Sequence, residues 1–202
     1  CLKFLTKLLA NRLQGVILMC IHRNQYGFLH CRSIQDCLAW CFEYIHQCKA
    51  SKRPIILLKL GFSKAFDTIE HDLILRILKH KGFDDRWTGW IDSILSSGSS
   101  SVLLNGVPGN HFVCRSGVRQ GDPLSLLLFV IAVDLLQSVV NEMCARNILT
   151  LPIPTSSRDY PIVQYADDTL IVLPAVDSQL IAFKDMLETF AKSTGLRVNF
   201  SK

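Results

Sequence analysis

Apolar side chains recur at helical spacing along much of the chain. Leu2, Leu5, Leu9, Leu13 and Val16 predict a first helix over residues 2–21. The same period predicts five further helices, over residues 33–49, 72–81, 85–96, 123–146 and 177–194. Within residues 72–81 the inward positions are expected to be Leu73, Ile74, Ile77 and Leu78.

Several of these helices carry end signals. Ser33 and Asp36 form a capping-box pattern, and Asp122 precedes a proline that suits the first helical position. Gly82 and Gly195 follow the last apolar positions of their helices, where glycine commonly ends a helix. These residues predict where four of the helices begin or end.

Shorter apolar runs predict strands. Residues 55–60 are almost entirely apolar, which is typical of a strand covered on both faces. Residues 162–165 and 170–173 flank a polar turn, and 196–200 form a last expected strand. Asn105-Gly106 predicts a β-hairpin turn between residues 101–104 and 111–115. Helices interleaved with this many hairpins indicate an α+β fold rather than a purely parallel sheet.

Charge is unevenly distributed along the chain. The 202 residues carry a net charge of +5, and 49% of them are hydrophobic, enough for a sizeable core. Residues 1–60 contain nine Lys and Arg against two acidic residues, so their +7 leaves −2 for the remainder. A basic first third suits contact with a phosphate backbone. An ordinary solvated surface explains the same charge equally well.

Cysteine usage and hydropathy exclude some classes. The eight cysteines include no Cys-x-x-Cys pair, which argues against structural zinc, and the chain is too long and apolar for a disulfide scaffold. Cys37, Cys41 and Cys48 share one helical stripe and are expected to be small buried hydrophobes in a reducing intracellular compartment. The longest apolar run, residues 126–133, is too short to span a bilayer, so no membrane partner is expected.

Two adjacent carboxylates, Asp167 and Asp168, stand out as candidate chemistry. They follow Tyr165-Ala166 between two apolar runs, where like charges repel each other. A hard divalent cation such as Mg²⁺ relieves that repulsion and favours carboxylate and phosphate oxygens. Taken alone, the pair is also typical of a simple polar turn between strands.

A central box and four surrounding segments, in the expected order, give the chain a family resemblance. The Tyr165–Asp168 box resembles the catalytic hairpin of reverse transcriptases. Residues 24–28 and 32–34 look like the beginning of the fingers in non-LTR enzymes, and 58–67 like the first catalytic block. Residues 117–125 look like the nucleotide-positioning block, and 195–202 like the segment that closes the palm. The resemblance covers essentially all 202 residues, and the amino-acid sequences of the motifs are most like those of plant LINE elements.

The resemblance implies a right-hand polymerase fold. Fingers are expected at about residues 1–53 and 70–100, and a palm with a small antiparallel sheet packed on helices at about 54–69 and 101–202, without a thumb. The implied activity is RNA-directed DNA polymerisation with Mg²⁺ and deoxynucleoside triphosphates on an RNA template and a DNA primer. The rest of a retrotransposon polyprotein, including an endonuclease and a thumb, is the implied partner. The implied location is the nucleus or cytoplasm of a plant cell.

The resemblance also assigns roles to individual residues. Asp167 and Asp168 would be catalytic and would bind the metals, and Lys202 would protonate the leaving pyrophosphate. Substrate contacts would come from Phe66 beneath the incoming sugar and from Arg119, Gln120 and Gly121. The alternative for Phe66 is a role as a core residue, and the alternative for Lys202 is that of an ordinary surface lysine.

Two positions depart from the family pattern. Gly61 stands where the family has its first catalytic aspartate, the third metal ligand, and Leu126 where it usually has proline. Phosphoryl transfer depends on positioning and charge neutralisation, so the loss at Gly61 predicts an inactive copy. A nucleic-acid-binding remnant without catalysis is therefore an alternative, as is another palm-type enzyme such as an RNA polymerase or intron maturase. If the palm assignment holds, Gly61 should lie beside the Asp167-Asp168 turn on neighbouring strands.

Overall fold

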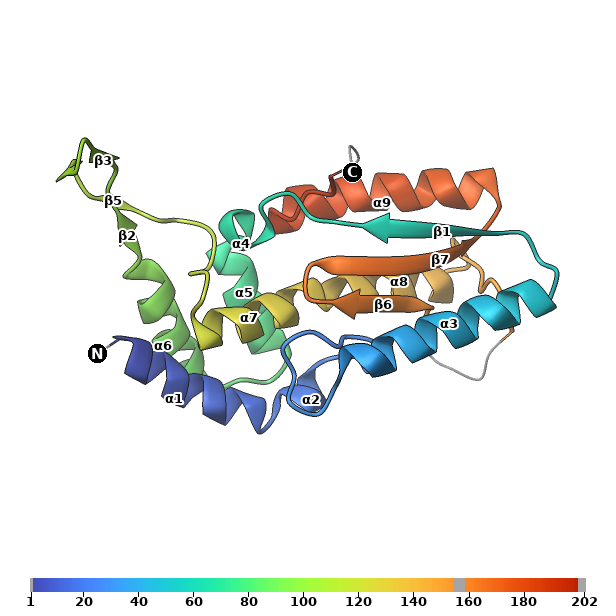
Figure 1. Ribbon diagram of the computed structural model, residues 1–202, viewed down its shortest axis with the longest axis horizontal. Helices are drawn as coiled ribbons and strands as arrows, with labels where there is room; N and C mark the ends of the chain where they lie inside the picture. Colours follow the sequence, from blue (N-terminus) through green and yellow to red (C-terminus); the bar gives the residue numbers. More distant parts are fainter. Residues whose placement is uncertain (1, 155–158, 200–202) are drawn as a thin grey trace.

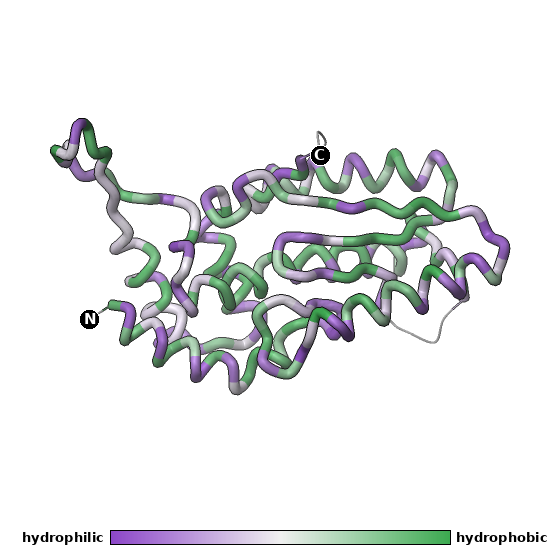
Figure 2. Tube along the Cα trace, in the orientation of Figure 1, coloured by the Kyte–Doolittle hydropathy of each residue, from purple (hydrophilic) through white to green (hydrophobic). Residues whose placement is uncertain are grey.

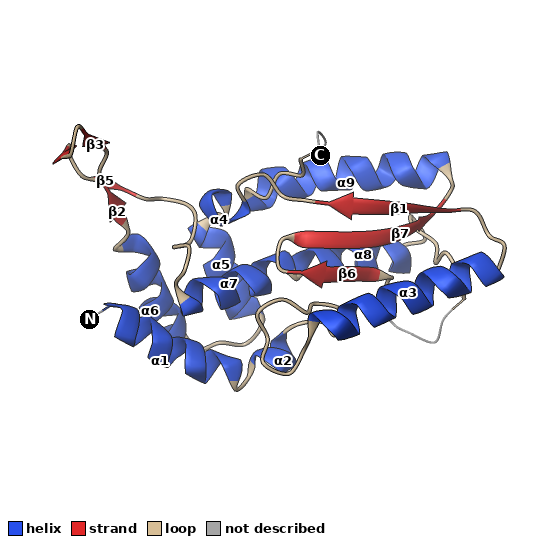
Figure 3. Ribbon diagram, in the orientation of Figure 1, coloured by secondary structure: helices blue, strands red, loops and turns tan. Residues whose placement is uncertain are grey.

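A computed structural model describes residues 2–154 and 159–199, and a three-stranded antiparallel sheet organises this part of the chain. The strand order is β1 (Ile55–Leu60), β7 (Asp168–Pro174) and β6 (Ile162–Tyr165). Helix α3 (Ile34–Ala50) runs along the β6 side, and α9 (Asp177–Thr194) packs on β7 (Figure 1). Figure 3 shows helices surrounding this small sheet, so the predicted α+β class is confirmed.

The core is built around α7 (Pro123–Val133). Its residues from Leu127 to Val133 are at most 2% exposed, and they appear as an apolar stretch in Figure 2. A helix that is apolar on all sides requires neighbours on all sides. Helices α1 (Leu2–Gln14) and α5 (His71–His80) pack on it, and α6 (Asp85–Ser96) packs on α5. The four predicted inward positions of α5 are all buried.

The helical stretch Pro123–Ala145 is long and apolar enough to cross a membrane by length and composition. However, 72% of its most apolar window is buried inside the structure, as in a core helix of a folded domain. Among the described residues, no other helix passes this test.

The predicted helix ends agree with the structure. The Ser33 hydroxyl accepts the backbone N–H of Asp36 at 3.1 Å, and it donates to the Asp36 carboxylate at 2.7 Å. The Asp122 carboxylate accepts from the N–H of Leu124 at 2.9 Å, directly before α7. Gly195 ends α9 with φ of 78°, a left-handed conformation that glycine adopts without strain.

Two predicted helices are interrupted. Residues 2–21 form α1 and the short α2 (Ile17–Cys20), separated at Gly15 and Val16, whose N–H groups bond to carbonyls three residues back. Glycine favours such a break because it loses the most backbone freedom in a helix. Residues 123–145 form α7 and α8 (Leu135–Ala145), which meet at Asp134. The prediction of continuous helices was wrong at both places.

Two strand predictions also need correction. The β1 strand is not covered on both faces, because Leu57 and Lys59 are exposed on one side while Leu60 is buried on the other. Among the described residues, it is an edge strand of the three-stranded sheet, and only β7 pairs along its length. The expected strand at 196–200 is reduced to a single bridge between Val198 and Phe62, and Phe200 lies outside the described residues.

A hairpin arm projects from the body (Figure 1). It consists of β2 (Ser99–Ser100), β3 (Leu103–Leu104), β4 (Val107–Pro108) and β5 (Phe112–Val113). The predicted turn at Asn105-Gly106 is confirmed, with φ of 51° and 83°. The register is different, because β3 pairs with β4 and β2 pairs with β5. The turn residues determine only the β3–β4 pairing next to them. The outer β2–β5 pairing begins shortly after the end of α6.

Candidate active site

The two candidate carboxylates lie in a tight hairpin turn. Tyr165 at the end of β6 pairs with Asp168 at the start of β7, which leaves Ala166 and Asp167 as the two loop residues. This aspartate turn (residues 165–168) confirms the predicted hairpin, although β7 begins two residues earlier than expected. Ala166 has φ of 56°, a conformation that two-residue hairpin loops require. Asp167 is half-buried, and the Asp168 side chain is 62% exposed.

Gly61 lies beside this turn. Leu60 pairs with Thr169 at the end of the antiparallel β1–β7 ladder. Gly61 follows Leu60 and Asp168 precedes Thr169, so the two residues occupy the next opposed positions. Directly opposed residues in antiparallel strands lie about 5 Å apart. The register therefore confirms that Gly61 and the aspartate turn meet at the ends of neighbouring strands. The carbonyl of Gly61 accepts the N–H of Asn199 at 2.8 Å, which fixes the backbone here.

The Gly61 position has room for a side chain. A Cβ built on Gly61 would meet no heavy atom within 4 Å, and the backbone is not in the left-handed region. A β-carbon therefore fits there without displacing a neighbour. The glycine is therefore not explained by a steric requirement of the fold.

The described residues do not fit a complete two-metal site. No group of three or more His, Cys, Asp or Glu among them is placed to hold a metal ion. Asp167 and Asp168 supply two carboxylates, whereas a hard cation gathers several oxygen ligands. The Lys59 ammonium lies 3.2 Å from Asp168 Oδ1 and already neutralises part of the charge.

A second region brings the expected substrate residues together. Phe66, in the short helix α4 (Ala65–Thr68), stacks on Phe129 of α7 with centroids 4.2 Å apart. A cleft of about 360 Å³ opens beside it, lined also by Asp67, Arg119 and Gln120. Gln120 Nε2 donates to the Asp67 carboxylate at 3.4 Å. The aspartate turn does not line this cleft, so its residues form a separate part of the candidate site.

Backbone contacts join the first catalytic block to the nucleotide-positioning block. Val118 N–H donates to the Phe66 carbonyl at 2.6 Å, and Gly117 N–H donates to the Ile69 carbonyl at 2.8 Å. Gly117 has φ of 80°, and a Cβ there would lie 2.7 Å from the Asp67 carbonyl oxygen. Glycine at this position is therefore required by close backbone approach.

The remaining predicted positions have mixed outcomes. Gly121 is exposed with φ of 78° and does not line the cleft. Lys202 lies outside the described residues, so its role stays a prediction. Arg32 of the basic first third is half-buried, and its guanidinium donates to the His22 carbonyl at 2.6 Å, so it stabilises the fold.

The predicted cysteine stripe is only partly buried. Cys37 and Cys48 are buried, whereas Cys41 is half-exposed. Burial raises the pKa of the Cys37 thiol to about 11, so this thiol stays protonated at neutral pH.

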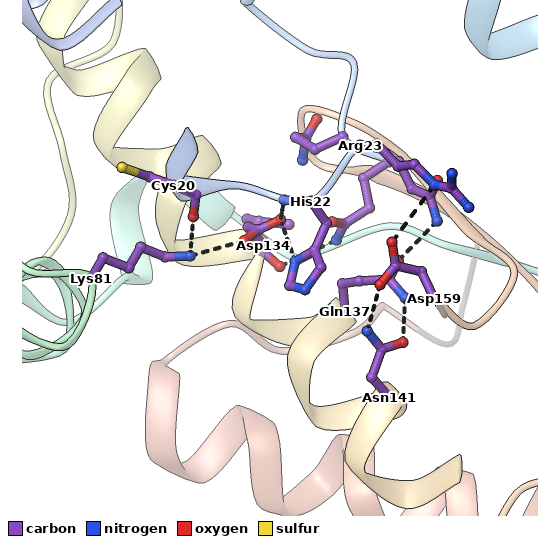
Figure 4. A network of polar contacts seen from close by, with 12 residues as sticks. Cys20, His22, Arg23, Lys81, Asp134, Gln137, Asn141 and Asp159 are labelled. Atoms are coloured by element: carbon purple, nitrogen blue, oxygen red, sulfur yellow. Dashed lines mark hydrogen bonds and ion pairs between the residues drawn. The ribbon is translucent and has the colours of Figure 1, made fainter. Parts of the chain in front are cut away.

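A buried polar network was missed from the sequence (Figure 4). Asp134, at the junction of α7 and α8, is fully buried and accepts the backbone N–H of His22 at 2.9 Å. The Nδ1 atom of His22 lies 3.0 Å from the same oxygen, and Lys81 Nζ lies 3.1 Å from the other. The hydrogen bond to Asp134 raises the pKa of His22, and burial opposes it. An acidic residue inside the apolar run 126–140 was the available signal.

Residues 24–27 were also missed as part of the site. The sequence placed this segment at the start of the fingers, but it runs beside β6 and touches the aspartate turn. Gln25 is fully buried there, and its Oε1 accepts the N–H of Ala166 at 3.3 Å. No local pattern reveals this contact, because 141 residues separate the two partners.

Comparison with solved structures identifies the fold. The chain superposes on telomerase from Candida albicans with a TM-score of 0.69 and 13% identity, covering 100% of this chain and 35% of that one. For apo telomerase from Candida tropicalis, truncated from its C-terminal domain, the TM-score is 0.65 at 16% identity, covering 98% and 38%. At this identity the likeness shows a shared fold, a right-hand polymerase arrangement with small antiparallel sheets packed on helices.

Sequence relatives come from retrotransposable elements. The chain is 25% identical to the transposon TX1 uncharacterized 149 kDa protein of Xenopus laevis, over 99% of this chain and 15% of that protein. It is 26% identical to a retrovirus-related Pol polyprotein of the R2 element of Popillia japonica, over 99% and 27%. For the R2DM polyprotein of Drosophila melanogaster the values are 27%, 98% and 18%.

The chain thus spans between 15% and 27% of the length of these three relatives. The profile of the family described as reverse transcriptase (RNA-dependent DNA polymerase) matches residues 1–202. The chain belongs to the reverse transcriptase family and is related to the enzymes of non-LTR retrotransposons.

Proposed function

We propose that this chain is the fingers and palm of a LINE-type retrotransposon reverse transcriptase whose catalytic centre is impaired at Gly61. The supporting observation is the strand register, in which Gly61 lies beside the aspartate turn. The intact domain would extend a DNA primer on an RNA template. Fingers at about 1–53 and 70–100, and a palm at about 54–69 and 101–202, remain our proposed division.

The impairment follows from the charge at the site. Family members bind Mg²⁺ and deoxynucleoside triphosphates, and the residues proposed for these roles are Asp167 and Asp168 for the metal and Phe66, Arg119 and Gln120 for the nucleotide. With glycine at position 61, one carboxylate is missing from this set. Removing one strong electrostatic contact from a catalytic site typically costs about 2.7–4 kcal/mol of transition-state stabilisation.

The origin and location of the element are further parts of the proposal. The amino-acid sequences of the motifs, such as residues 58–67 and 117–125, favour a plant LINE element. An endonuclease and a thumb on the same polyprotein are the expected partners, and the nucleus or cytoplasm of a plant cell is the expected location. The sequence of the remaining polyprotein tests these points.

A primer-extension assay tests the proposal. The chain as given should not extend a primer, whereas Gly61→Asp in a chain that also carries a thumb should gain Mg²⁺-dependent extension. A Cβ at position 61 meets no heavy atom within 4 Å, which supports the choice of this replacement. Gly89→Asp is a control that adds a carboxylate elsewhere, at an exposed position of α6 where a Cβ likewise meets no heavy atom within 4 Å. Equal extension by the unmodified chain and the Gly61→Asp chain would contradict the proposed impairment.

A non-catalytic nucleic-acid-binding remnant is the second candidate. It is favoured by Gly61 and by Lys59, whose ammonium reaches Asp168. Exposed lysines and arginines of residues 1–60, such as Lys3, Lys7 and Arg12, would then contact phosphate.

Binding of single- or double-stranded nucleic acid should be weak and should fall steeply as salt rises. Each phosphate contact adds roughly one unit to the slope of log K against log salt. Fluorescence anisotropy at several salt concentrations measures this slope, and an affinity insensitive to salt would exclude the basic first third as the binding surface.

A further inference from the structure

The aspartate turn is held from outside by residues 24–27. The N–H of Tyr26 donates to the Gln164 carbonyl at 2.8 Å, and the N–H of Gln164 donates to the Asn24 carbonyl at 2.9 Å. The segment therefore runs parallel to the end of β6. A Cβ on Gly27 would lie 2.3 Å from the backbone nitrogen of Ala166, so segment and turn are in direct backbone contact.

Gln25 lies at the centre of this contact. Its side chain is fully buried, and its Oε1 accepts two backbone N–H groups, from Gly27 at 2.9 Å and from Ala166 at 3.3 Å. Its Nε2 is buried without a hydrogen-bond partner among the described residues. An unsatisfied buried donor is costly. The unpaired Nε2 is therefore unfavourable, and the Oε1 of the same side chain accepts the N–H groups of Gly27 and Ala166.

Ala166 needs external support. Its φ of 56° lies in the left-handed region, which a residue with a Cβ rarely adopts. Such conformations persist where surrounding structure over-determines them, and they cluster at functional sites. The carboxylates of Asp167 and Asp168 follow directly, so the direction in which they leave the turn depends on the backbone of Ala166.

We propose that Gln25 is a positioning residue for the aspartate turn. Its Oε1 holds the N–H of Ala166 and thereby fixes the backbone that presents Asp167 and Asp168. We call the hydrogen bond from the Ala166 N–H to Gln25 Oε1 the lock. The effect on catalysis rests on the proposed function, whereas the lock itself does not depend on that function.

Amide hydrogen exchange, measured by NMR on the 202-residue chain, tests the lock. Gln25→Met keeps the side-chain length and removes the acceptor. The amides of Ala166 and Gly27 should then exchange at least about fivefold faster, as expected for loss of one hydrogen bond. The amides of Tyr26 and Gln164 bond to backbone carbonyls and should keep their rates within about twofold.

Thr194→Val is the control. Thr194 is also buried, and its Oγ1 accepts the backbone N–H of Leu196 at 3.1 Å, at the end of α9. This change removes a side-chain acceptor from a backbone N–H outside the aspartate turn and outside residues 24–27. The ratio of Ala166 exchange to Gln164 exchange should stay unchanged in Thr194→Val and rise in Gln25→Met.

Two results would overturn the proposal. One is equal acceleration of all four amides in Gln25→Met, which would indicate general loosening of the segment. The other is unchanged exchange at Ala166. If Gln25→Met does not fold, Gln25→Glu is the second variant, because it retains an acceptor oxygen. The Ala166 amide should exchange slowly in Gln25→Glu, and fast exchange of this amide would count against the lock.

A kinetic measurement separates the lock from the proposed function. In a Gly61→Asp chain that extends a primer, adding Gln25→Met should lower kcat at least about fivefold and leave KM for the nucleotide within about twofold, because the nucleotide cleft is separate. An unchanged kcat would overturn the positioning role. Absence of extension in the Gly61→Asp chain itself would contradict the proposed function, and the exchange result would still decide the lock.

Discussion

Asp134 and Asp168 lie at nearly the same distance from a lysine but in opposite surroundings. The Asp134–Lys81 pair spans 3.1 Å with side chains 0% and 17% exposed, and the Asp168–Lys59 pair spans 3.2 Å with side chains 62% and 73% exposed. A buried charge cannot lose its partner without a large penalty, whereas an exposed one is solvated and screened. Burial rather than distance therefore separates a carboxylate that holds the fold from one that is free to exchange its partner.

The partners of the two carboxylates reinforce this difference. Asp134 ties the N-terminal segment to the α7–α8 junction through His22, and it ties the end of α5 to the same junction through Lys81 (Figure 4). Asp168 has Lys59 as its ion-pair partner among the described residues, at the open end of the sheet. A cation arriving at the aspartate turn would replace Lys59 at little cost to the fold.

Removing Asp134 should give the largest effect. Asp134→Ala leaves Lys81 nearly buried without a counter-charge and the backbone N–H of His22 without an acceptor, which should lower the free energy of unfolding by about 3–5 kcal/mol. Urea unfolding followed by circular dichroism measures the loss. Asp168→Ala is the matched control, and an equal loss in both variants would contradict the comparison.

The pH dependence of stability should show the same network at smaller amplitude. The pKa of His22 is raised from 6.5, first by the Asp134 hydrogen bond and also by the nearby Asp159, with burial and Lys81 opposing. A raised pKa means that protonated His22 stabilises the folded chain fully below about pH 6.5 and less as pH rises through the raised value. The free energy of unfolding should therefore decline as pH rises above about 6.5.

The variant His22→Gln isolates this contribution. It should flatten the decline, and so should Asp134→Ala, because the carboxylate is the main cause of the shift. His30→Gln is a control at an exposed histidine. A decline of the same size in His22→Gln as in the unmodified chain would show that other groups produce it.

Breaking the exposed pair should give the smallest effect. Lys59→Ala should change the free energy of unfolding by less than about 1 kcal/mol, and the change should shrink further at high salt. A double-mutant cycle with Asp168→Ala measures the coupling between the two side chains. A coupling as large as that between Lys81 and Asp134 would show that exposure does not separate the two pairs.

Local sequence patterns predicted much of the fold. The inward face of α5, the caps at Ser33 and Asp122, the stop at Gly195 and the Asn105-Gly106 turn are all confirmed. Each of these depends on residues within a few positions of one another. The hairpin that carries the aspartate turn was predicted for the same reason, from two apolar runs around a short polar loop.

The failed predictions involve contacts between distant parts of the chain. The Asp134 side chain, at the interruption between α7 and α8, is held by His22 and Lys81, which lie 112 and 53 residues earlier in the chain. Leu57 is exposed on one face of β1, which is an edge strand. An apolar run in the sequence does not show whether another element packs on the second face of the strand. In each case a tertiary partner overrides the local pattern.

The sequence by itself determined the family, most of the helices and the turn that carries two carboxylates. Motif sequences, hydrophobic periodicity and turn residues are local properties, so they can be recognised without the tertiary structure. It also showed that position 61 lacks a carboxylate. Only the tertiary structure decided that Gly61 has room for a side chain, that Gln25 reaches the amide of Ala166, and that Asp134 is fully buried. These facts depend on which surfaces meet when the chain folds, and burial and hydrogen-bond partners exist only once distant segments are packed together.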